Sequence, residues 1–155
     1  MKRVSWFLEA AFLAALSFPF AALPYKTALK AGEILGLSVF YLWGSRRRIA
    51  IENIGKASIN NRQTAVILAR ETFKNMGRSF VEVMKIYYGL GKGIIDRVEI
   101  RGAENYQKAK AKNRGVIVIT GHCGNWEMAA IVFGFKVDAI YGVARRQNNP
   151  YFHAF

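Results

Sequence analysis

The sequence predicts an α/β protein in which membrane-associated helices at the N-terminus are followed by a βαβαβ unit. Segment 4–25 is almost uncharged, and its length is about that of a helix that spans a bilayer. Farther along, three runs of strand-like composition, at 97–101, 116–120 and 139–143, are separated by two segments of helical composition. Strands that alternate with helices pair in parallel through right-handed crossovers, so we expect a parallel sheet.

Composition limits the possible partners. The 155 residues suffice for one domain, 52% of them are hydrophobic, and 23 basic against 10 acidic residues give a net charge of +13. A sequence that is both apolar and strongly basic suits a membrane surface with anionic lipids. Nucleic acid is the competing partner, but we expect none, because the sequence shows no RNA-binding aromatic signature and no zinc-finger spacing. Cys123 is the only cysteine, which excludes an intrachain disulfide and fits a reducing compartment.

The N-terminal apolar segment has three possible interpretations: a membrane anchor, a signal peptide or a core helix. Two basic residues precede it, and one glutamate and two prolines interrupt it. The residues around Ala22 show no small-x-small cleavage pattern. We therefore expect residues 1–25 to be an uncleaved hydrophobic membrane anchor and residues 26–155 to belong to one further domain.

A second apolar stretch occupies residues 26–43. It is too short and too charged for a confident membrane span, so we expect it to lie in the interface or to pack on the domain. Arg46, Arg47 and Arg48 follow it directly. Three arginines beside apolar helices either hold lipid phosphates or stand in solvent and mark the cytoplasmic side.

A long amphipathic helix is expected next. Asn60, with Gln63 three residues later, gives a start that resembles a capping box. Apolar residues at spacings of three and four then form one core-facing stripe, with basic side chains away from it. Three glycines within 89–93 end the helix. The stripe consists of Ala69, Phe73, Met76, Phe80, Met84 and Tyr87, and the basic residues are Arg70, Lys74, Arg78 and Lys85.

A group of polar residues follows the second predicted strand. Gly121 and Gly124 permit a tight turn because glycine tolerates positive φ, and Asn125 suits the cap of the next helix. His122 in the turn and Glu127 in the first helical turn can then meet. A carboxylate held against an imidazole fixes its tautomer, which makes the histidine a general base toward a hydroxyl. The sequence therefore predicts a catalytic dyad.

Other interpretations of these residues remain open. A single histidine near a single glutamate is often an ordinary surface or core pair. Cys123 is a conceivable nucleophile beside His122, although adjacent side chains usually diverge. A metal site built from His122, Glu127 and His153 lacks a recognisable ligand spacing.

The third predicted strand supplies another residue for the same crevice. Ligands of open α/β sheets bind beyond the carboxyl ends of the strands. His122 follows the second strand and Arg145 follows the third, so we expect both to face one crevice. A guanidinium offers a planar fork suited to phosphate or to a developing oxyanion; the alternative is an ordinary surface arginine.

Two sequence blocks carry a resemblance to a known family. The string GHCGNWE at 121–127 closely resembles the Gly-His-x-Gly-Asn-Trp-Glu form of the His-x-x-x-x-(Asp/Glu) box of bacterial lipid A biosynthesis acyltransferases, the lauroyl and myristoyl transferases of the lysophospholipid acyltransferase superfamily. The string GVARRQNNPY at 142–151 resembles the family's second block, in which an arginine precedes Asn-Pro. Arg145 takes the place of that arginine, whereas Arg146 stands where many relatives have proline.

The resemblance implies a membrane-associated O-acyltransferase with a glycerolipid-acyltransferase-like α/β domain. It would move a fatty acyl chain from acyl-acyl carrier protein to a hydroxyl or hydroxyacyl group of a phosphorylated lipid A precursor. His122 would be the general base, Glu127 its orienting carboxylate, and Arg145, Asn125 and Asn149 substrate-binding residues. The mechanism needs no metal or other cofactor. The implied location is the bacterial inner membrane, with the catalytic part on the cytoplasmic side.

Two alternative functions share the same composition. One is a non-catalytic fragment that binds anionic lipid or a membrane surface, and the other is an acyltransferase that acts on another glycolipid. Family members continue well beyond the position of Phe155, so we expect these residues to form the N-terminal part of the domain, with an incomplete sheet. An uncovered sheet edge and face would make the 155 residues poorly soluble and inactive on their own.

Overall fold

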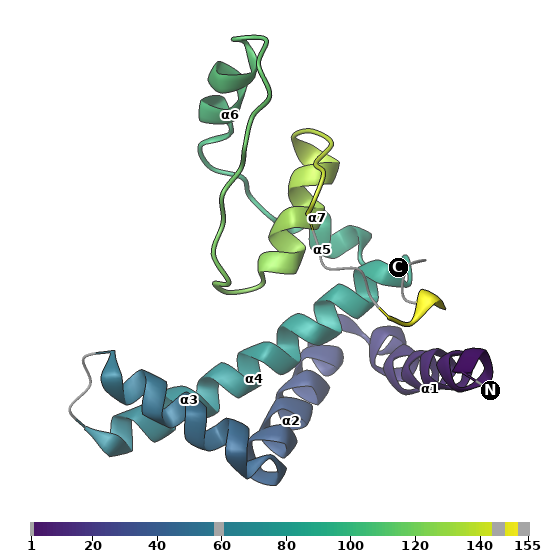
Figure 1. The fold of residues 1–155 in the computed structure, drawn as a ribbon, viewed down its shortest axis with the longest axis vertical. Coiled ribbons are helices and arrows are strands. Elements are labelled where there is room, and N and C mark those ends of the chain that lie inside the picture. The colour runs from purple at the N-terminus through teal and green to yellow at the C-terminus, as the bar shows by residue number, and fades with distance from the viewer. Residues whose placement is uncertain (1, 58–60, 144–147, 152–155) are drawn as a thin grey trace.

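The computed structural model describes residues 2–57, 61–143 and 148–151. Within these ranges the chain forms helices joined by turns and extended segments (Figure 1). Helices α1 to α4 make one body, and α5 to α7 lie beyond the C-terminal end of α4 (Figure 1). The helices are α1 (Lys2–Ala22), α2 (Tyr25–Leu42), α3 (Gly44–Lys56), α4 (Arg62–Tyr87), α5 (Lys92–Arg97), α6 (Ala103–Lys110) and α7 (Trp126–Lys136).

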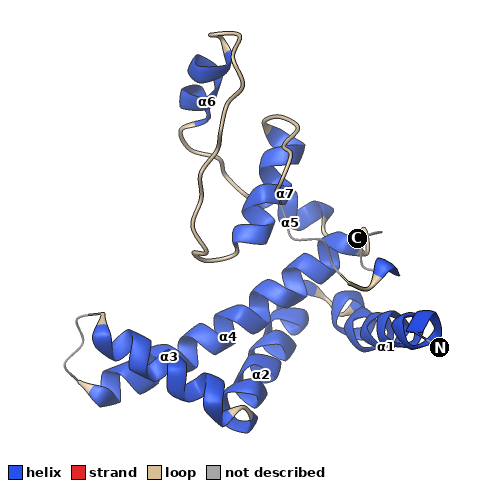
Figure 2. Ribbon diagram, viewed as in Figure 1, coloured by secondary structure: helices blue, strands red, loops and turns tan. Residues whose placement is uncertain are grey.

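The predicted α/β fold with a βαβαβ unit is wrong: in the part of the chain that the structure describes there is no strand and no sheet (Figure 2). Segments 116–120 and 139–143 have no regular secondary structure, and Arg97 belongs to α5. β-Branched residues favour an extended backbone, but a strand exists only where a neighbouring strand shares its backbone hydrogen bonds. Ile117 and Ile119 are 88% and 90% exposed, so this run lacks the burial on both faces that the prediction required.

The expected helices are confirmed, with somewhat different bounds. Helix α4 is capped by Asn61, whose Oδ1 accepts hydrogen bonds from the amides of Gln63 at 2.9 Å and Thr64 at 3.3 Å. The predicted cap, Asn60, lies outside the described residues. Helix α7 includes Gly134 and ends at Lys136.

The most extensive helix contact in the described chain joins α2 and α4. A Cβ atom placed on Gly36 would overlap the carbonyl oxygen of Phe73, and one placed on Gly77 would overlap that of Gly32. Glycine is therefore needed where the two backbones touch. Buried residues, most of them small, recur every fourth position on both helices, which is the ridge that interlocks in the commonest class of helix packing. Ala28, Gly32 and Gly36 belong to the ridge on α2, and Ala65, Ala69 and Gly77 to the ridge on α4.

The buried stripe of α4 differs from the predicted one. Ala69 and Phe73 are buried as expected and form a core cluster with Phe40 of α2. Met76, Phe80 and Tyr87 are instead exposed. The contact through glycine follows a strict spacing of four, whereas the prediction mixed spacings of three and four. The buried positions are Ala65, Ala69, Phe73, Gly77, Val81 and Lys85.

Lys85 is buried, although the sequence pattern places it away from the core stripe. Its Nζ donates hydrogen bonds to the carbonyl oxygens of Ala21 at 2.6 Å and Leu23 at 2.7 Å, at the end of α1. The last carbonyls of a helix have no partner within the helix and carry the negative end of its dipole, so an ammonium group satisfies them. Lys85 thereby fastens α1 to α4.

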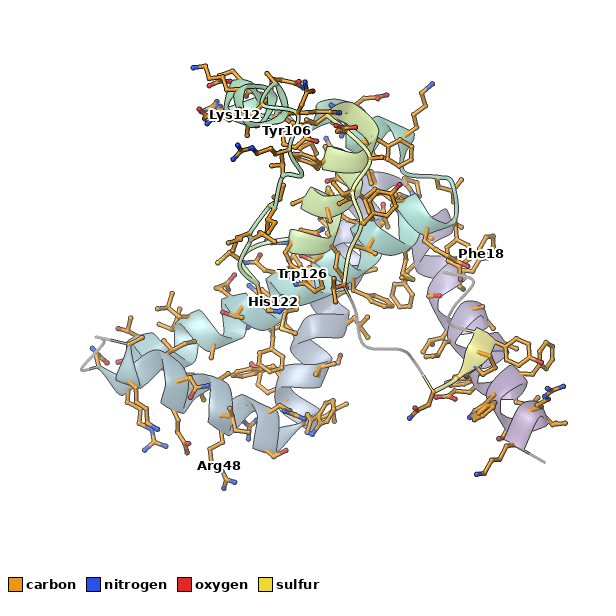
Figure 3. All side chains as sticks on the ribbon, turned by 45° about the horizontal axis from the view of Figure 1, so that its top comes forward. Phe18, Arg48, Tyr106, Lys112, His122 and Trp126 are labelled. Atoms are coloured by element: carbon orange, nitrogen blue, oxygen red, sulfur yellow. The ribbon has the colours of Figure 1, made fainter. Side chains whose placement is uncertain are left out.

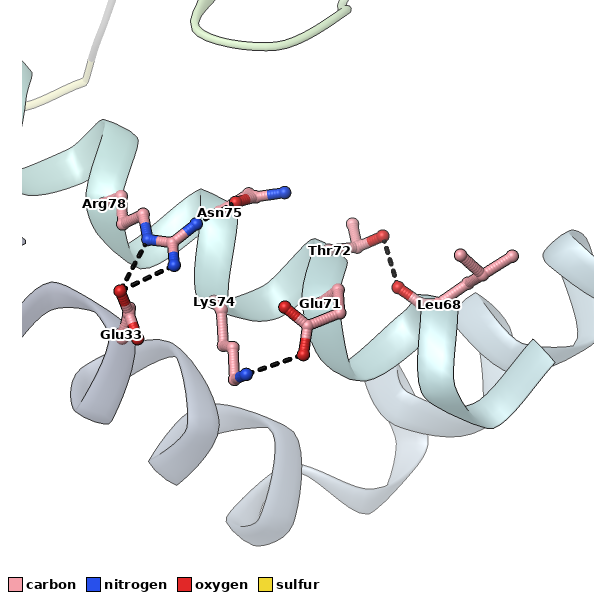
Figure 4. A network of polar contacts seen from close by, with 7 residues as sticks. All are labelled: Glu33, Leu68, Glu71, Thr72, Lys74, Asn75 and Arg78. Carbon is pink, nitrogen blue, oxygen red and sulfur yellow. Dashed lines mark hydrogen bonds and ion pairs between the residues drawn. The ribbon is translucent and has the colours of Figure 1, made fainter. Parts of the chain in front are cut away.

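Polar contacts along the α2–α4 junction lie closer to solvent. Arg78 Nε donates to Glu33 Oε1 at 2.8 Å across the junction, and Lys74 pairs with Glu71 within α4 at 2.6 Å (Figure 4). Ion pairs so close to solvent contribute little to stability. The stability of the junction therefore depends mainly on the close packing of its small residues.

Helix α1 is the single helix of the described chain that is long and apolar enough to cross a membrane, judged by length and composition. Only its C-terminal part packs closely on the body, where Ser17 and Ala21 are buried. Ser17 Oγ lies 2.9 Å from the hydroxyl of Tyr88. Large apolar side chains nearer the N-terminus, such as Phe7 and Phe12, are exposed.

Candidate active site

The polar turn before α7 has the tight form that the sequence predicts. The amide of Cys123 donates to the carbonyl oxygen of Gly121 at 2.8 Å, and Gly124 adopts a φ of 58°, which glycine reaches without strain. Gly121 does not need a positive φ. Asn125 Oδ1 accepts a hydrogen bond from the amide of Met128 at 3.1 Å, which confirms Asn125 as the cap of α7.

His122 is exposed in this turn, and Glu127 lies in the first turn of α7. The imidazole meets the indole of Trp126 edge to face, with ring centres 4.7 Å apart (Figure 3). Among the described residues no hydrogen bond or ion pair joins His122 to Glu127. The structure thus puts both residues at the start of one helix, and their catalytic pairing stays a prediction.

Glu127 borders a large apolar groove. The groove has a volume of about 840 Å³ and is lined by side chains of α1, α2, α4 and α7. Leu13 and Phe20 contribute from α1, and Phe80 from α4, while Trp126 and Glu127 contribute from α7. The volume falls in the range of about 300–1,000 Å³ that is usual for ligand pockets. A carboxylate beside so much hydrocarbon surface suits a substrate with one polar reacting group and one long apolar part.

A partly buried carboxylate on α4 holds the turn in place. Glu82 Oε2 accepts a hydrogen bond from Asn125 Nδ2 at 3.0 Å, and Glu82 Oε1 accepts one from the hydroxyl of Tyr25 at 2.7 Å. Asn125 therefore uses its oxygen to cap α7 and its amide nitrogen to attach that cap to α4. Glu82 links the first turn of α2, the C-terminal part of α4 and the start of α7.

The same network changes the acidity of Tyr25. Burial, followed by the hydrogen bond to the Glu82 carboxylate, raises the pKa of Tyr25 to about 12. The guanidinium of Arg97 lies 5.3 Å from the centre of the Tyr25 ring and acts in the opposite direction. Tyr25 therefore remains a protonated donor to Glu82 throughout the neutral range.

The other end of α7 is fastened to α6. Tyr106 donates from its hydroxyl to Asp138 Oδ2 at 2.6 Å, and Lys110 pairs with the same carboxylate. The hydrogen bond from Lys110, then that from Tyr106, lowers the pKa of Asp138 to about 2. The rings of Tyr106 and Phe133 also meet edge to face, 5.1 Å apart. Helix α7 is thus held at both ends, at its cap and just beyond its last turn.

Comparison with known proteins decides between the functional classes. A family model described as bacterial lipid A biosynthesis acyltransferase matches residues 2–155. The chain belongs to this family of acyltransferases. No match was found among curated proteins or among solved structures. Membership makes the protein an acyltransferase of the lipid A kind, which uses an acyl donor and a lipid acceptor.

The second sequence block of this acyltransferase is only partly described. Arg145 and His153 lie outside the described residues, so their predicted roles stay untested. Asn149 is buried, and its Nδ2 donates to the carbonyl oxygen of Trp6 at 3.0 Å and to Glu9 Oε2 at 3.0 Å. Its contacts therefore attach the second block to α1, while its substrate-binding role stays a prediction.

Two further predictions concern Cys123 and a metal. Cys123 is a free, exposed cysteine in the turn, and its backbone rather than its thiol makes the contact described above. Within residues 2–57, 61–143 and 148–151 no group of three or more metal-ligating side chains comes together. His153, the third residue of the metal-site hypothesis, lies outside the described residues, so that hypothesis stays untested.

Sequence reasoning missed Glu82 and the groove. A signal for Glu82 was present, because Glu82 and Lys85 are the only charged residues in the otherwise apolar segment 79–88. A charge in such a segment is retained only if it finds a partner. The groove had no comparable signal, since its walls come from four helices far apart in the sequence.

Proposed function

We propose that this lipid A acyltransferase takes its acyl chain from acyl-acyl carrier protein and transfers it to a hydroxyl group of a phosphorylated lipid A precursor, with His122 as general base. An imidazole nitrogen of His122 removes the proton of the acceptor hydroxyl while its oxygen attacks the thioester carbonyl. The C–O bond forms, the C–S bond breaks, and the carrier thiol leaves with the proton that His122 returns. Glu127 orients the imidazole and stabilises its protonated form.

The observation that carries the proposal is the position of the family's box at the start of α7, with Glu127 on the edge of the apolar groove. The groove offers an apolar surface for the acyl chain beside the proposed reacting groups. No hydrogen bond joins His122 to Glu127 in the structure, and catalytic hydrogen bonds often tighten only when substrate is bound. Arg145 would stabilise negative charge on the substrate, and Asn125 and Asn149 would shape the surrounding loops.

The proposed setting is the bacterial inner membrane, with α1 as the anchor and the box on the cytoplasmic side. Three observations support it. Helix α1 has the length and composition of a membrane span, its N-terminal half exposes large apolar side chains, and the chain has a net charge of +13. A basic surface also suits both an acidic carrier protein and a phosphorylated acceptor. A further glycolipid remains the alternative acceptor.

Replacement of His122 by Ala tests the base assignment. Loss of a positioned general base reduces turnover by about 10²–10⁴-fold, which transfer of labelled acyl chains to a lipid A precursor, by the full-length enzyme in membranes, would measure. The matched control is Cys123→Ser in the neighbouring position, which we expect to keep near-normal transfer. If Cys123→Ser were inactive and His122→Ala active, the base assignment would be contradicted and a cysteine nucleophile indicated instead.

A further inference from the structure

The corner between α2 and α3 exposes a combination of side chains that the proposed chemistry does not use. Leu42 is 86% exposed and Trp43 is 55% exposed, and the neighbouring Tyr41 and Ile49 are also exposed. Segment 41–49 contains three arginines and no carboxylate. We call the exposed residues Tyr41, Leu42, Trp43, Arg46, Arg48 and Ile49 the α2–α3 corner.

The three arginines of this segment do not have the same role. Arg47 is turned inward: its Nη1 donates to the carbonyl oxygens of Phe40 at 3.5 Å and Tyr41 at 3.4 Å, at the end of α2. Arg46 lies over the indole of Trp43, 5.5 Å from the ring centre. Arg48 is 75% exposed, and its closest carboxylate oxygen, in Glu52, is 3.9 Å away. Arg47 therefore shapes the corner, and Arg46 and Arg48 present their charges outward.

A cleft beside the corner adds further positive charge. It has a volume of about 810 Å³ and lies between α3 and the start of α4. Its lining includes Arg47, Arg48 and Arg62, with Glu52 as the one acidic residue. Guanidinium groups around such a cleft suit phosphate oxygens, which they bind through two parallel hydrogen bonds.

The corner lies on the opposite side of the molecule from the surface around α6. In Figure 3, Arg48 points away from the body at the lower edge of the picture, whereas Lys112 lies at the opposite edge. A charge change at Lys112 is therefore remote from the α2–α3 corner.

We propose that the α2–α3 corner is a second membrane contact, in which Leu42 and Trp43 enter the interface and Arg46 and Arg48 bind anionic lipid headgroups. Tryptophan and tyrosine gather at the level of the headgroups, and arginines there are attracted to the anionic leaflet. An acidic protein would be recognised by the arginines, but it would leave the protruding Leu42 without an apolar environment. The proposal rests on the proposed association of this protein with a membrane.

Trp43 itself reports whether the corner enters the membrane. The experiment uses the protein with Trp6 and Trp126 replaced by Phe, reconstituted in vesicles that contain anionic phospholipids brominated near the headgroup. We expect strong quenching of Trp43 emission there and weaker quenching in zwitterionic vesicles. Arg46→Glu together with Arg48→Glu should abolish the quenching. The control is Lys108→Glu together with Lys112→Glu, which changes the net charge by the same amount but on the exposed surface around α6. The quenching should persist in this control.

The outcomes separate this proposal from the anchoring role of α1. Vesicle flotation without quenching of Trp43 would leave α1 as the anchor and overturn the second contact. Absence of both flotation and Trp43 quenching would overturn the anchoring role of α1 as well. Quenching of Trp43 that persists after the double charge reversal would also overturn the proposal. So would a change in Trp43 emission that an acidic carrier protein causes and anionic vesicles do not.

Discussion

Two regions of this protein are built in different ways. The body of α1 to α4 is held by contacts that repeat every fourth residue, with glycines of α2 and α4 touching backbone to backbone. Region 98–143 has fewer fixed points, among them the Glu82–Asn125 bond at one end of α7 and the Tyr106–Asp138 and Lys136–Val98 bonds at the other. Its extended segments leave Ile117, Ile119 and Tyr141 almost fully exposed. The family's box therefore lies at the junction between a closely packed body and a loosely supported region.

Replacement of Gly77 by Ala should give the largest effect, a loss of stability of the closely packed body. The added methyl group would overlap the backbone of α2, so the helices must separate. Overpacking of this kind costs about 1–3 kcal/mol, and we expect the upper end of that range because backbone rather than a flexible side chain must move. The gain in helix propensity, about 1 kcal/mol, offsets only part of it. Thermal unfolding in detergent, followed by circular dichroism, measures the change.

Gly55→Ala in α3 is the matched control for that substitution. No atom lies within 4 Å of a Cβ placed at Gly55, so only the propensity gain applies and the melting temperature should stay or rise slightly. Equal destabilisation by the two substitutions would show that the α2–α4 contact is not the tight one described.

Replacement of Lys85 by Met should loosen α1 from the body. The carbonyl oxygens of Ala21 and Leu23 would lose their donor, and unsatisfied buried groups cost about 1–3 kcal/mol. Hydrogen exchange of the last turn of α1 should accelerate. Lys74→Met removes a surface pair with Glu71 and should destabilise the protein less than Lys85→Met does. A larger effect at Lys74 than at Lys85 would argue against the proposed capping of α1.

Glu82, the carboxylate that joins the body to Asn125, can be tested through the acidity of Tyr25, its other partner within the body. Its pKa of about 12 lies above the ordinary value of 10, so the protonated phenol contributes stability that is present below pH 10 and is lost as the pH rises through about 12. Glu82→Gln removes the carboxylate charge, which should lower the pKa of Tyr25 toward 10. An ultraviolet titration, with Tyr25→Phe subtracted to isolate this phenol, measures the shift. An unchanged titration would mean that Glu82 does not hold Tyr25.

The parts of this structure that the sequence predicts are those that depend on local contacts. The turn at Gly124, the cap at Asn125 and the existence of α4 follow from residues within one or two helical turns. The prediction of strands was wrong because a strand needs a partner strand, and the composition of the apolar run 116–120 does not indicate whether one is present. The exposure of Met76 and Phe80 depends on how closely Gly36 and Gly77 let two helices approach, which periodicity alone does not show.

The candidate site also combines local features, which the sequence indicates, with long-range contacts, which it does not. His122 and Glu127 are found from one short string, and the family match covers the same string within residues 2–155. The contact of Glu82 with Asn125 spans 43 positions, and that of Asn149 with Glu9 spans 140, so no local pattern indicates them. The apolar groove beside Glu127 is visible only once α1, α4 and α7 are placed together.

The most direct test of the central claim, that His122 and Glu127 act as one catalytic unit, is a double-mutant cycle on acyl transfer. The rates to compare are those of the full-length enzyme and of its His122→Ala, Glu127→Gln and doubly substituted forms, with the same donor and acceptor. Residues that act as a unit are strongly non-additive, so we predict that the double variant is no slower than His122→Ala alone. Losses that multiply in the double variant would show that the two residues act independently and would contradict the proposed dyad.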